Sequence, residues 1–468
     1  MNVSRRIAEP ILALDVPIRC HIVGIGGPGM SAIARLLVEM GHAVTGSDLH
    51  ESEVIDELRL RGAEISIGHR ESVVHGADVV TYSTAIPATN VELVEARRSG
   101  IETRHRSGML ASLCAATNAV GIAGTHGKTT TTALVTAMTT AGGLRPSSII
   151  GADVLGGNGN VHGDGSLLII EADESDGTLD VLPLSSLVVT NIDIDHLDYF
   201  GTFDAIKVCF GDAVARTGGV VVLNADDEGS ADLVRVLSKE IRVTTFGRSE
   251  NSTVRITSSA SHNEGTLVDV CVADQTYRCA LKLRGEHNVM NFAAALAMAI
   301  RLGVDPVVAC TAASAFRGVA RRFTERGDFR GSLLIDDYAH LPAEISSTID
   351  AVRSHPALQG RVVAVFQPNR YHRIATMADS YADCFAHADR VVITDVYASG
   401  TQKIEGVTGE LVVNAIRRAH NDADVVWAQS RADTVAAVES WIAPGDICIS
   451  MGCGDIESFP DDLRGVVK

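Results

Sequence analysis

The sequence predicts an α/β protein built from three domains, and three observations lead to this prediction. The chain has 468 residues, which is too long for one ordinary domain. Its residues are 46% hydrophobic and include 43 glycines, the composition of a globular protein with many tight strand–helix turns. Short apolar runs alternate with helical segments along the chain, and most of these runs end in polar or glycine-rich turns.

The overall charge and the cysteines narrow the range of functions. A formal net charge of −18 argues against a nucleic-acid partner, because phosphate backbones require a basic surface. The nine cysteines form no Cys-x-x-Cys pair, which predicts reduced thiols in a cytoplasm. The N-terminus lacks the pattern of a signal peptide, and no apolar run is long enough to span a bilayer. We therefore expect a cytoplasmic protein that acts on small molecules, with no membrane partner.

The first domain begins with a glycine-rich turn between a strand and a helix. The apolar strand 20–23 leads into Gly-Ile-Gly-Gly-Pro-Gly at 24–29, and Ser31 offers a further donor where the helix begins. A second strand at 43–46 ends next to Asp48, so the pattern is close to the Rossmann-like dinucleotide fingerprint. The loop only requires backbone to approach a pyrophosphate. It therefore fits a NAD-type cofactor and a sugar nucleotide equally well.

Further strands of this domain also end in polar side chains. Strands are predicted at 64–67 and 79–82, followed by a helix at 87–99 and a connector at 103–110. Four side chains then fall at the C-terminal ends of predicted strands: Asp48, His69, Ser83 and Thr84. Open α/β sheets bind their ligands at these ends, so we expect a shared ligand here. Considered alone, His69 would be an ordinary surface histidine.

A phosphate-binding loop is predicted where the second domain starts. The apolar run 119–123 precedes Gly-Thr-His-Gly-Lys-Thr-Thr at 124–130, and a helix is expected at 133–140. Glycines let backbone N–H groups surround phosphate oxygens, while Lys128 would reach the outer phosphates and Thr129 would bind Mg²⁺. The loop is shorter than the standard form, so a glycine turn with an exposed lysine is the alternative.

Two acidic turns follow consecutive apolar strands downstream of this loop. The strand 167–170 ends in the acidic run 171–176, and the strand 187–190 ends in the run 191–198. Mg²⁺ prefers oxygen ligands together with substrate phosphates, so Glu171 is the first candidate for a metal ligand. His196 is less expected, because imidazole suits softer metals. The alternative is two solvated turns.

The next segment combines short strands with an alanine-rich helix. Residues 219–280 are expected to form short strands and turns that extend the sheet. The helix starts near Gly285 and carries Asn288 and Asn291, which lie three residues apart and so share one face. Amide side chains can pair with base edges, whereas a helix-capping asparagine is the simpler interpretation.

The third domain shows four strand-like runs separated by helical stretches, which predicts another doubly wound unit. These runs are 333–335, 362–366, 391–394 and 447–450. Polar side chains again follow the strands, among them Arg370 and Arg373 at a helix start. Two arginines three residues apart could hold a carboxylate bidentately, although a solvated helix turn is equally consistent with them.

Taken in order, these motifs resemble those of the Mur ligase family across essentially the whole chain. The resemblance rests on nine segments: 24–30, 124–132, 171–176, 191–198, 285–291, 321–323, 337–340, 366–368 and 454–456. Sister ligases and folylpolyglutamate synthetases share the phosphate loop. The Asp-Tyr-Ala-His and Phe-Gln-Pro elements point to the branch of the family that adds alanine.

The resemblance implies the domain roles and the reaction. It implies a Rossmann-like UDP-sugar domain at 1–112, a central P-loop-type ATP domain at 113–326 and a Rossmann-like amino-acid domain at 327–468. The implied enzyme uses ATP and Mg²⁺ to join L-alanine to the lactyl carboxylate of UDP-N-acetylmuramate, through an acyl phosphate, in peptidoglycan precursor synthesis. A monomer or a homodimer is expected.

The resemblance also implies roles for individual residues, matched by position. Those expected to bind ATP are Gly124, Thr125, His126, Gly127, Lys128, Thr129, Thr130, Asn288, Asn291, Arg322 and Asp337. Those expected to bind the UDP-sugar are Gly26, Gly27, Gly29, Met30, Ser31, Asp48, Leu49, His69, Ser83 and Thr84. The expected metal ligands are Thr129, Glu171 and His196. Catalysis is assigned to Lys128, Glu171, His196 and Arg322, and alanine binding to Tyr338, His340, Arg370 and Arg373.

The chain departs from the family pattern in three places, and those at Leu341 and Asn369 bear on the preferred amino acid. Leu341 and Asn369 stand where the family has histidines, and Ser107-Gly108 replaces an Ala-Glu pair. A sister ligase with another amino-acid preference therefore remains an alternative. A NAD-linked oxidoreductase and a non-catalytic nucleotide-binding regulator are two others. Several sister ligases carry a carbamylated lysine near Lys207, but the alanine-adding enzymes do not rely on one, so no such role is expected.

Overall fold

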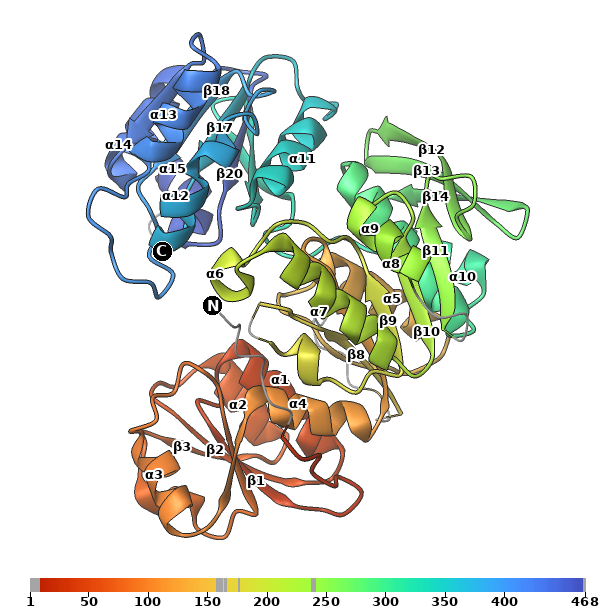
Figure 1. The fold of residues 1–468 in the computed structure, drawn as a ribbon. Coiled ribbons are helices and arrows are strands. Elements are labelled where there is room, and N and C mark those ends of the chain that lie inside the picture. Colours follow the sequence, from red (N-terminus) through yellow and green to blue (C-terminus); the bar gives the residue numbers. More distant parts are fainter. Residues whose placement is uncertain (1–8, 157–162, 164–165, 176, 237–240, 466–468) are drawn as a thin grey trace. The chain divides into compact units, whose positions relative to one another are not determined.

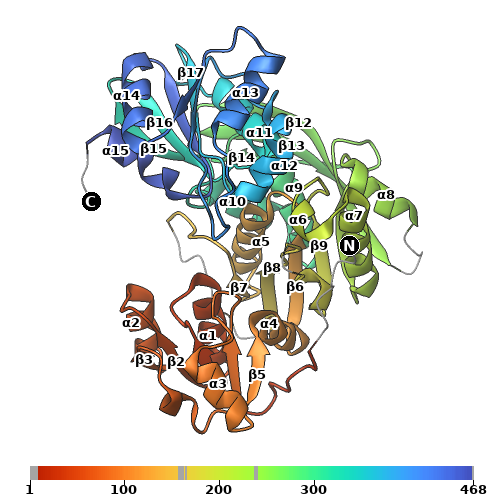
Figure 2. The same ribbon diagram turned by 60° about the vertical axis from the view of Figure 1, so that its left-hand side comes forward.

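The computed structural model of the chain describes residues 9–156, 163, 166–175, 177–236 and 241–465 (Figure 1). The chain divides into two compact units. The first unit comprises residues 1–255 and 293–312, and the second comprises 256–292 and 313–468. The described residues form an α/β structure in which helices flank three sheets (Figures 1 and 2), as the alternating apolar runs predict.

A five-stranded parallel sheet opens the first unit, with the order β3-β2-β1-β4-β5. Its strands are β1 (Arg19–Val23), β2 (Ala43–Asp48), β3 (Glu64–Ile67), β4 (Val79–Tyr82) and β5 (Glu102–His105). Its helices are α1 (Pro28–Glu39), α2 (Glu53–Leu60), α3 (Val91–Arg98) and α4 (Arg106–Ala115). The strand order changes direction between β1 and β4, which is the switch point where such sheets bind ligands.

The connector expected at 103–110 is wrong, because this segment forms β5 and the start of α4. The β5 sequence Glu-Thr-Arg-His has no apolar residue, so its pattern gives no strand signal. It forms an edge strand through backbone pairing with β4 alone. Residue 112, where we place the end of the first domain, lies inside α4.

The second sheet has nine strands in the order β14-β13-β12-β11-β10-β9-β6-β8-β7. Its strands are β6 (Asn118–Ala123), β7 (Ser147–Ile149), β8 (Leu167–Glu171), β9 (Ser186–Val189), β10 (Val220–Asn224), β11 (Arg242–Gly247), β12 (Val254–His262), β13 (Gly265–Val272) and β14 (Gln275–Leu281). The expectation that residues 219–280 extend the sheet is confirmed. The associated helices are α5 (Lys128–Ala141), α6 (Leu197–Phe200), α7 (Phe203–Arg216) and α8 (Glu228–Val236).

Helix α5 begins at Lys128, five residues before the expected start at 133. Four consecutive threonines, Thr129–Thr132, hide this start, because β-branched residues have low helix propensity. Their side chains are buried, and the Thr132 hydroxyl donates to the Lys128 carbonyl oxygen at 2.8 Å. Burial thus overrides propensity, and the phosphate loop leads directly into the helix N-terminus.

The third sheet lies within the second unit and has six strands in the order β15-β16-β20-β17-β18-β19, all parallel except for the β15–β16 pair. Its strands are β15 (Thr324–Phe329), β16 (Ser332–Asp337), β17 (Val362–Phe366), β18 (Arg390–Thr394), β19 (Val425–Ala428) and β20 (Ile447–Met451). The remaining helices of the chain are α9 (Glu286–Arg301), α10 (Pro306–Ala315), α11 (Pro342–Arg353), α12 (Tyr371–Met377), α13 (Glu410–Ala419), α14 (Arg431–Trp441) and α15 (Phe459–Leu463).

The four strands predicted for this sheet are confirmed, but β15 and β19 were not predicted. Both are edge strands, and β15 has the mostly polar sequence Thr-Glu-Arg-Gly-Asp-Phe. The predicted domain start at residue 327 falls inside β15. By contrast, every residue of the central strand β17 is buried, so its apolar run matches the strand bounds.

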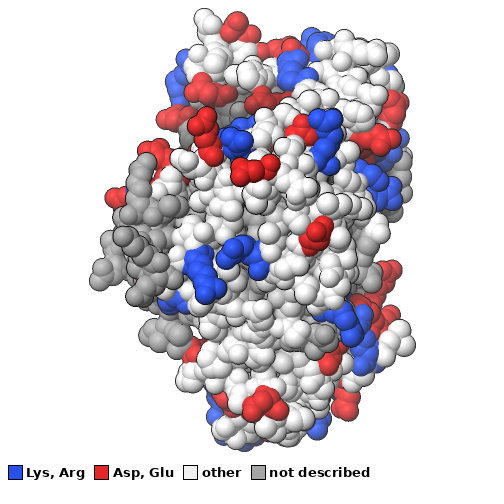
Figure 3. All heavy atoms as spheres, turned by 90° about the vertical axis from the view of Figure 1, so that its right-hand side faces the viewer, with Lys and Arg blue, Asp and Glu red and all other residues white. Residues whose placement is uncertain are grey.

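The surface and the thiols agree with the composition. All nine cysteines are free, and seven of them are buried. Acidic and basic side chains intermingle over the described residues of the face drawn in Figure 3, and they do not merge into one basic surface there. In the described part of the chain, no helix has the length and hydropathy of a membrane span.

Candidate active site

The phosphate loop follows β6 and requires glycine at two positions. Gly124 has φ +126°, and a Cβ at this position would lie 2.1 Å from Thr190 Oγ1. Gly127 has φ +81° and caps the N-terminus of α5. L-residues are strained in this backbone region, so both positions favour glycine. The sequence motif therefore reflects both backbone conformation and close packing.

The end of β9 holds the loop in place. Thr190 Oγ1 donates to the His126 carbonyl oxygen at 2.5 Å. The Asn191 amide accepts from His126 N at 2.9 Å and donates to the same carbonyl oxygen at 3.1 Å. The His126 ring lies 3.2 Å from Asp193, a hydrogen bond that holds the pKa of Asp193 below its usual value. The second acidic turn thus fastens the loop, a role that the sequence did not predict.

Lys128 points back across the loop to a buried carboxylate. Its Nζ donates to the Gly124 carbonyl oxygen at 2.7 Å and lies 3.0 Å from Glu174 Oε2. Glu174 is only 2% exposed. Burial alone would lower the pKa of Lys128, but the Glu174 and Asp173 carboxylates outweigh it and hold that pKa above its ordinary value. Glu174 stands in an acidic run that we singled out for Glu171, so its pairing with the lysine was missed.

The predicted oxygen donors for a metal meet beside the loop. Thr129 Oγ1 donates to Glu171 Oε2 at 3.2 Å, and Gly151 N donates to Glu171 Oε1 at 2.6 Å. His196 pairs instead with Asp195 at 2.9 Å. No group of three His, Cys, Asp or Glu side chains suited to a metal occurs within the described residues. One hydroxyl and one carboxylate still fit Mg²⁺, which commonly combines one or two carboxylates with water and substrate phosphates.

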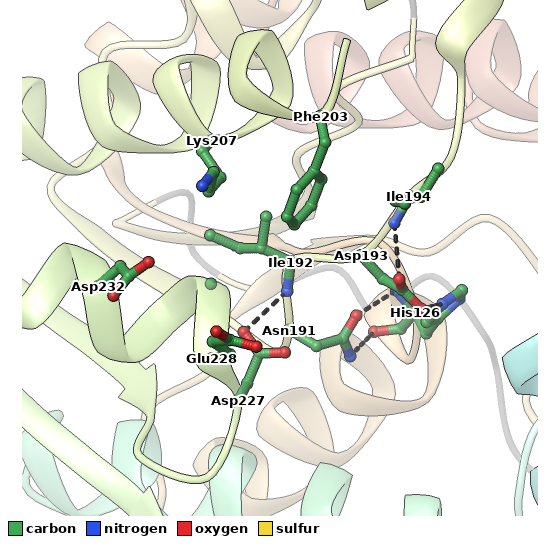
Figure 4. A pocket seen from close by; sticks show the side chains of 11 residues that line it. His126, Asn191, Ile192, Asp193, Ile194, Phe203, Lys207, Asp227, Glu228 and Asp232 are labelled. Carbon is green, nitrogen blue, oxygen red and sulfur yellow. Dashed lines mark hydrogen bonds and ion pairs between the residues drawn. The ribbon is translucent and has the colours of Figure 1, made fainter.

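A cavity of about 380 Å³ lies next to the loop (Figure 4). His126 forms part of its wall, together with Asn191 and residues of α7 and α8. Phe203 and Lys207 come from α7, and Lys207 Nζ lies 5.1 Å from the Phe203 ring centroid. Lys207 also pairs with Asp204 at 3.2 Å. The volume is near the lower end of the roughly 300–1,000 Å³ typical of small-molecule sites.

The first glycine-rich loop lies where β1 ends in the five-stranded sheet. Gly26 N donates to Asp48 Oδ2 at 2.9 Å, and Leu49 N donates to Asp48 Oδ1 at 2.7 Å. Met30 and Ser31 are buried, and their N–H groups bond to the Gly27 carbonyl oxygen. Both residues are buried in this structure, and their contact with the sugar nucleotide stays a prediction.

The other predicted residues of this domain lie at the carboxyl ends of strands β3 and β4. His69 follows β3, and Ser83 and Thr84 follow β4. A Cβ placed on Gly29 would lie 3.0 Å from Arg106 Nη1, so a basic side chain borders the loop. Arg106 was missed because it stands in a segment that we interpreted as a connector.

In the second unit, the structure brings together several residues expected near ATP. Asn291 Nδ2 donates to Asn288 Oδ1 at 3.2 Å, so the two amides share a helix face as predicted. The Asp337 carboxylate accepts from Phe323 N and Ala339 N at 2.7 Å each. Burial raises the pKa of Asp337 to about 6, against the effect of nearby Arg322. The Arg322 guanidinium lies 4.9 Å from the Tyr338 ring centroid.

The residues expected at the amino-acid site also cluster in the second unit. The rings of Tyr338 and His340 meet edge to face at 5.6 Å. Arg370 caps α12 and has φ +60°, while Arg373 is buried and donates to Asn369 Oδ1 at 2.8 Å. Burial raises the pKa of the Cys453 thiol, whereas nearby Arg373 and Arg370 act to lower it. The asparagine that departs from the family pattern thus supports one of the two arginines.

The predicted residues therefore fall into groups that belong to different units. The phosphate loop, Glu171, His196 and the first glycine-rich loop lie in the first unit. Asn288, Asn291, Arg322, Asp337 and the four residues expected to bind alanine lie in the second. Within each unit most of these residues follow strands, whereas Asn288 and Asn291 lie in the first turns of α9.

Comparison with known proteins identifies all three parts of the chain. Residues 19–118 match the family model described as "Mur ligase family, catalytic domain". Residues 122–299 match the "Mur ligase middle domain", and residues 321–454 match the "Mur ligase, glutamate ligase domain". The matched ranges together cover most of the sequence.

Curated relatives and solved structures agree with these matches. The chain is 40% identical over 448 residues to UDP-N-acetylmuramate–L-alanine ligase of Sinorhizobium fredii, covering 93% of this chain and 94% of that relative. It is 39% identical over 458 residues to the enzyme of the same name from Rhodopseudomonas palustris, with 96% and 97% covered. The structure of UDP-N-acetylmuramate–alanine ligase from Thermotoga maritima matches with a TM-score of 0.74 and 26% identity, covering 96% of this chain and 98% of that one. A murein peptide ligase from Psychrobacter arcticus, 22% identical, shares the fold with a TM-score of 0.67 over 96% of this chain and 98% of that one.

Proposed function

The chain belongs to the Mur ligase family, and on this premise we propose that it joins L-alanine to UDP-N-acetylmuramate with hydrolysis of ATP to ADP and phosphate. The single observation that carries this proposal is the phosphate loop with its two carboxylates. Lys128 and Thr129 stand at the N-terminus of α5, and Glu174 and Glu171 contact them directly. Binding of a nucleoside triphosphate with Mg²⁺ requires a cation for the phosphates, and a hydroxyl and a carboxylate for the metal.

The reaction follows from the chemistry of amide formation. The lactyl carboxylate is a poor electrophile, so its oxygen attacks the γ-phosphorus of ATP and ADP leaves. The amine of alanine then attacks the carbonyl carbon of the acyl phosphate, and phosphate leaves from a tetrahedral intermediate. Lys128 and Arg322 stabilise charge on the transferring group, so catalysis rests on positioning and electrostatics. Bound Mg²⁺, held by Thr129 and Glu171 with His196 at a second position, would neutralise phosphate charge.

In this proposal, each domain binds one substrate. Residues 1–112 bind the UDP-sugar, residues 113–326 bind ATP, and residues 327–468 bind alanine. The reaction belongs to peptidoglycan precursor synthesis in the cytoplasm, and the nine free cysteines support this compartment. We propose a monomer or a homodimer as the active species.

Release of inorganic phosphate tests the reaction directly. We expect phosphate release only when UDP-N-acetylmuramate, ATP, Mg²⁺ and an amino acid are all present, with L-alanine faster than glycine or L-serine. A sister ligase would prefer another amino acid, and the departures at Leu341 and Asn369 make this comparison informative. Absence of turnover with every small amino acid would favour the non-catalytic regulator.

Thermal unfolding separates the ligase from the oxidoreductase interpretation. A ligand at about 100 times its Kd stabilises the folded state by about 2.7 kcal/mol. We therefore expect ATP with Mg²⁺, and separately UDP-N-acetylmuramate, to raise the unfolding temperature by several degrees, and NADH to leave it unchanged. Stabilisation by NADH alone would contradict the ligase.

Replacing either arginine of α12 by lysine is expected to raise the KM for alanine by roughly tenfold or more, with little change in the KM for ATP. A hydrogen bond to a charged group contributes about 1.5–3 kcal/mol, and lysine cannot reproduce the bidentate geometry of Arg370 or Arg373. Steady-state kinetics with each substrate varied measures this difference. Arg361→Lys is a matched control, because Arg361 lies at the other end of β17 and pairs with Asp446 at 2.9 Å. Equal increases in both KM values would argue against a carboxylate clamp.

A further inference from the structure

A fully buried carboxylate in the first domain accepts four hydrogen bonds. Glu92, in the first turn of α3, has no exposed surface. Its Oε2 accepts from Ser47 Oγ at 2.7 Å and from His21 Nε2 at 3.1 Å. Its Oε1 accepts from His69 Nδ1 and from Arg70 N, both at 3.2 Å. Burial would raise the pKa of Glu92, but the hydrogen bonds from His21 and Ser47 outweigh it and lower that pKa.

The network determines which ring nitrogen of each histidine faces Glu92. Ser47 has one hydroxyl hydrogen, and it is donated to Glu92. His69 Nδ1 lies 3.1 Å from the same hydroxyl oxygen and 3.2 Å from Glu92 Oε1, so Nδ1 carries a hydrogen that it donates inward. His21 donates from Nε2 to Glu92, and its Nδ1 lies 2.8 Å from Thr45 Oγ1.

The remaining nitrogen of His69 is left for a ligand. Within the described residues, Nε2 of His69 makes no hydrogen bond, and the side chain is 17% exposed. His69 follows β3, whose last residue Ile67 pairs with Asp48 at the end of β2. Gly68 N donates to the Asp48 carbonyl oxygen at 2.8 Å, and the Asp48 side chain binds Gly26 of the glycine-rich loop. Nε2 therefore borders the edge of the sheet where the sugar nucleotide is proposed to bind.

We propose that Glu92 is a positioning residue for the sugar nucleotide: it holds His69 with Nδ1 directed inward and Nε2 presented to the nucleoside diphosphate. This inference rests on the proposed function. Glu92 reaches β1 through His21 and the neighbouring β2 through Ser47, which lies two residues beyond Thr45, the partner of His21 in the sheet. Its place in the first helical turn also suits a negative charge, since backbone N–H groups point toward it.

Helix α3 offers a matched control carboxylate. Glu95 lies three residues after Glu92 and is 3% exposed. It accepts from Arg98 Nε at 2.7 Å, Ser99 Oγ at 2.8 Å and His75 Nε2 at 3.0 Å. Arg98 lies on α3, Ser99 directly follows this helix, and His75 directly follows Val74. None of these three partners lies at the carboxyl end of a strand. Loss of Glu95 thus reports the structural cost of removing a buried carboxylate from this helix.

Binding of UDP, measured by calorimetry, tests the proposal with five proteins: the native chain, Glu92→Gln, Glu95→Gln, His69→Gln and the Glu92→Gln/His69→Gln double variant. We expect Glu92→Gln to raise the Kd for UDP roughly tenfold, as for loss of one hydrogen bond to a charged partner. Glu95→Gln should leave the Kd for UDP within about twofold of the native value. All variants should bind ATP with Mg²⁺ as tightly as the native chain does. The double variant should bind UDP no more weakly than His69→Gln, because Glu92 acts through His69.

Three results would overturn the proposal. One is an unchanged Kd for UDP in folded Glu92→Gln, and another is a further tenfold loss when Glu92→Gln is added to His69→Gln. The third is a native chain that does not bind UDP, which would also contradict the proposed binding of the UDP-sugar by this domain. Failure of the Glu92 proposal alone is distinguishable from it, because the native chain then still binds UDP. If Glu92→Gln does not fold, Ser47→Ala carries the test, because it removes one bond to Glu92 and one neighbour of His69. It should weaken UDP binding in the native background and have no further effect in His69→Gln.

Discussion

Replacing Lys128 by alanine is expected to lower kcat roughly 10²–10³-fold, the loss seen when a preorganised donor to developing charge is removed. Lys128 is the first residue of α5, and its Nζ reaches back to the Gly124 carbonyl oxygen within the phosphate loop. Phosphate release at saturating UDP-N-acetylmuramate, ATP, Mg²⁺ and alanine measures kcat. Near-full activity in a folded variant would show that the loop does not act on the transferring phosphoryl group.

The ion pair between Lys128 and Glu174 provides the control for this experiment. Glu174 is 2% exposed, and removing one partner of a buried pair typically costs about 3–5 kcal/mol. Lys128→Ala should therefore also lower the unfolding temperature. Adding Glu174→Gln removes the unpaired charge, so the double variant should recover much of the stability and none of the kcat. Recovery of kcat along with stability would mean that Lys128 acts only as the partner of Glu174.

The buried centre of the fold could be predicted from the sequence, whereas its polar edges could not. Strands β4 and β17 lie where their apolar runs predicted them, and the edge strand β3 was predicted only because Ile65 and Ile67 alternate with polar residues. The edge strands β5 and β15 consist mainly of polar residues, and they are strands because a neighbouring strand offers its free backbone groups. The start of α5 was hidden for a related reason, since burial of Thr129–Thr132 overrides their low helix propensity.

In the candidate site, the roles that follow from a local sequence pattern were predicted, and the pairings that depend on strand order were not. Thr129 and Glu171 were each predicted as Mg²⁺ ligands from a local pattern, a phosphate loop and an acid after a strand, and the structure brings the two side chains into contact. The contacts of Glu174 with Lys128 and of Asn191 with His126 join residues 46 and 65 positions apart. Such pairings depend on which strands are neighbours, and strand order is not visible in one sequence. Knowing that β9 lies beside β6 would have indicated that Asn191 faces the loop.

Replacing Glu171 by glutamine is expected to raise the Mg²⁺ concentration for half-maximal activity by at least roughly tenfold, since weakened support of a metal ligand alone costs about 10–100-fold in affinity. Glutamine keeps the shape of the side chain and its contact with Thr129 Oγ1 but loses the negative charge. A lower kcat should remain at saturating Mg²⁺, because metal ions commonly supply several kcal/mol of charge stabilisation in the transition state. Activity titrated with Mg²⁺ at fixed, saturating ATP gives both quantities.

Glu174→Gln is the matched control for this prediction, because Glu174 stands three residues later in the same acidic run. Glu174 contacts Lys128 and Glu171 contacts Thr129, so the two carboxylates act on different groups of the loop. Glu174→Gln should change the KM for ATP by altering how Lys128 is held, while its Mg²⁺ requirement stays near that of the native chain. If both variants shift the Mg²⁺ requirement equally, the metal depends on the total charge of the loop region, and Glu171 is not a specific ligand.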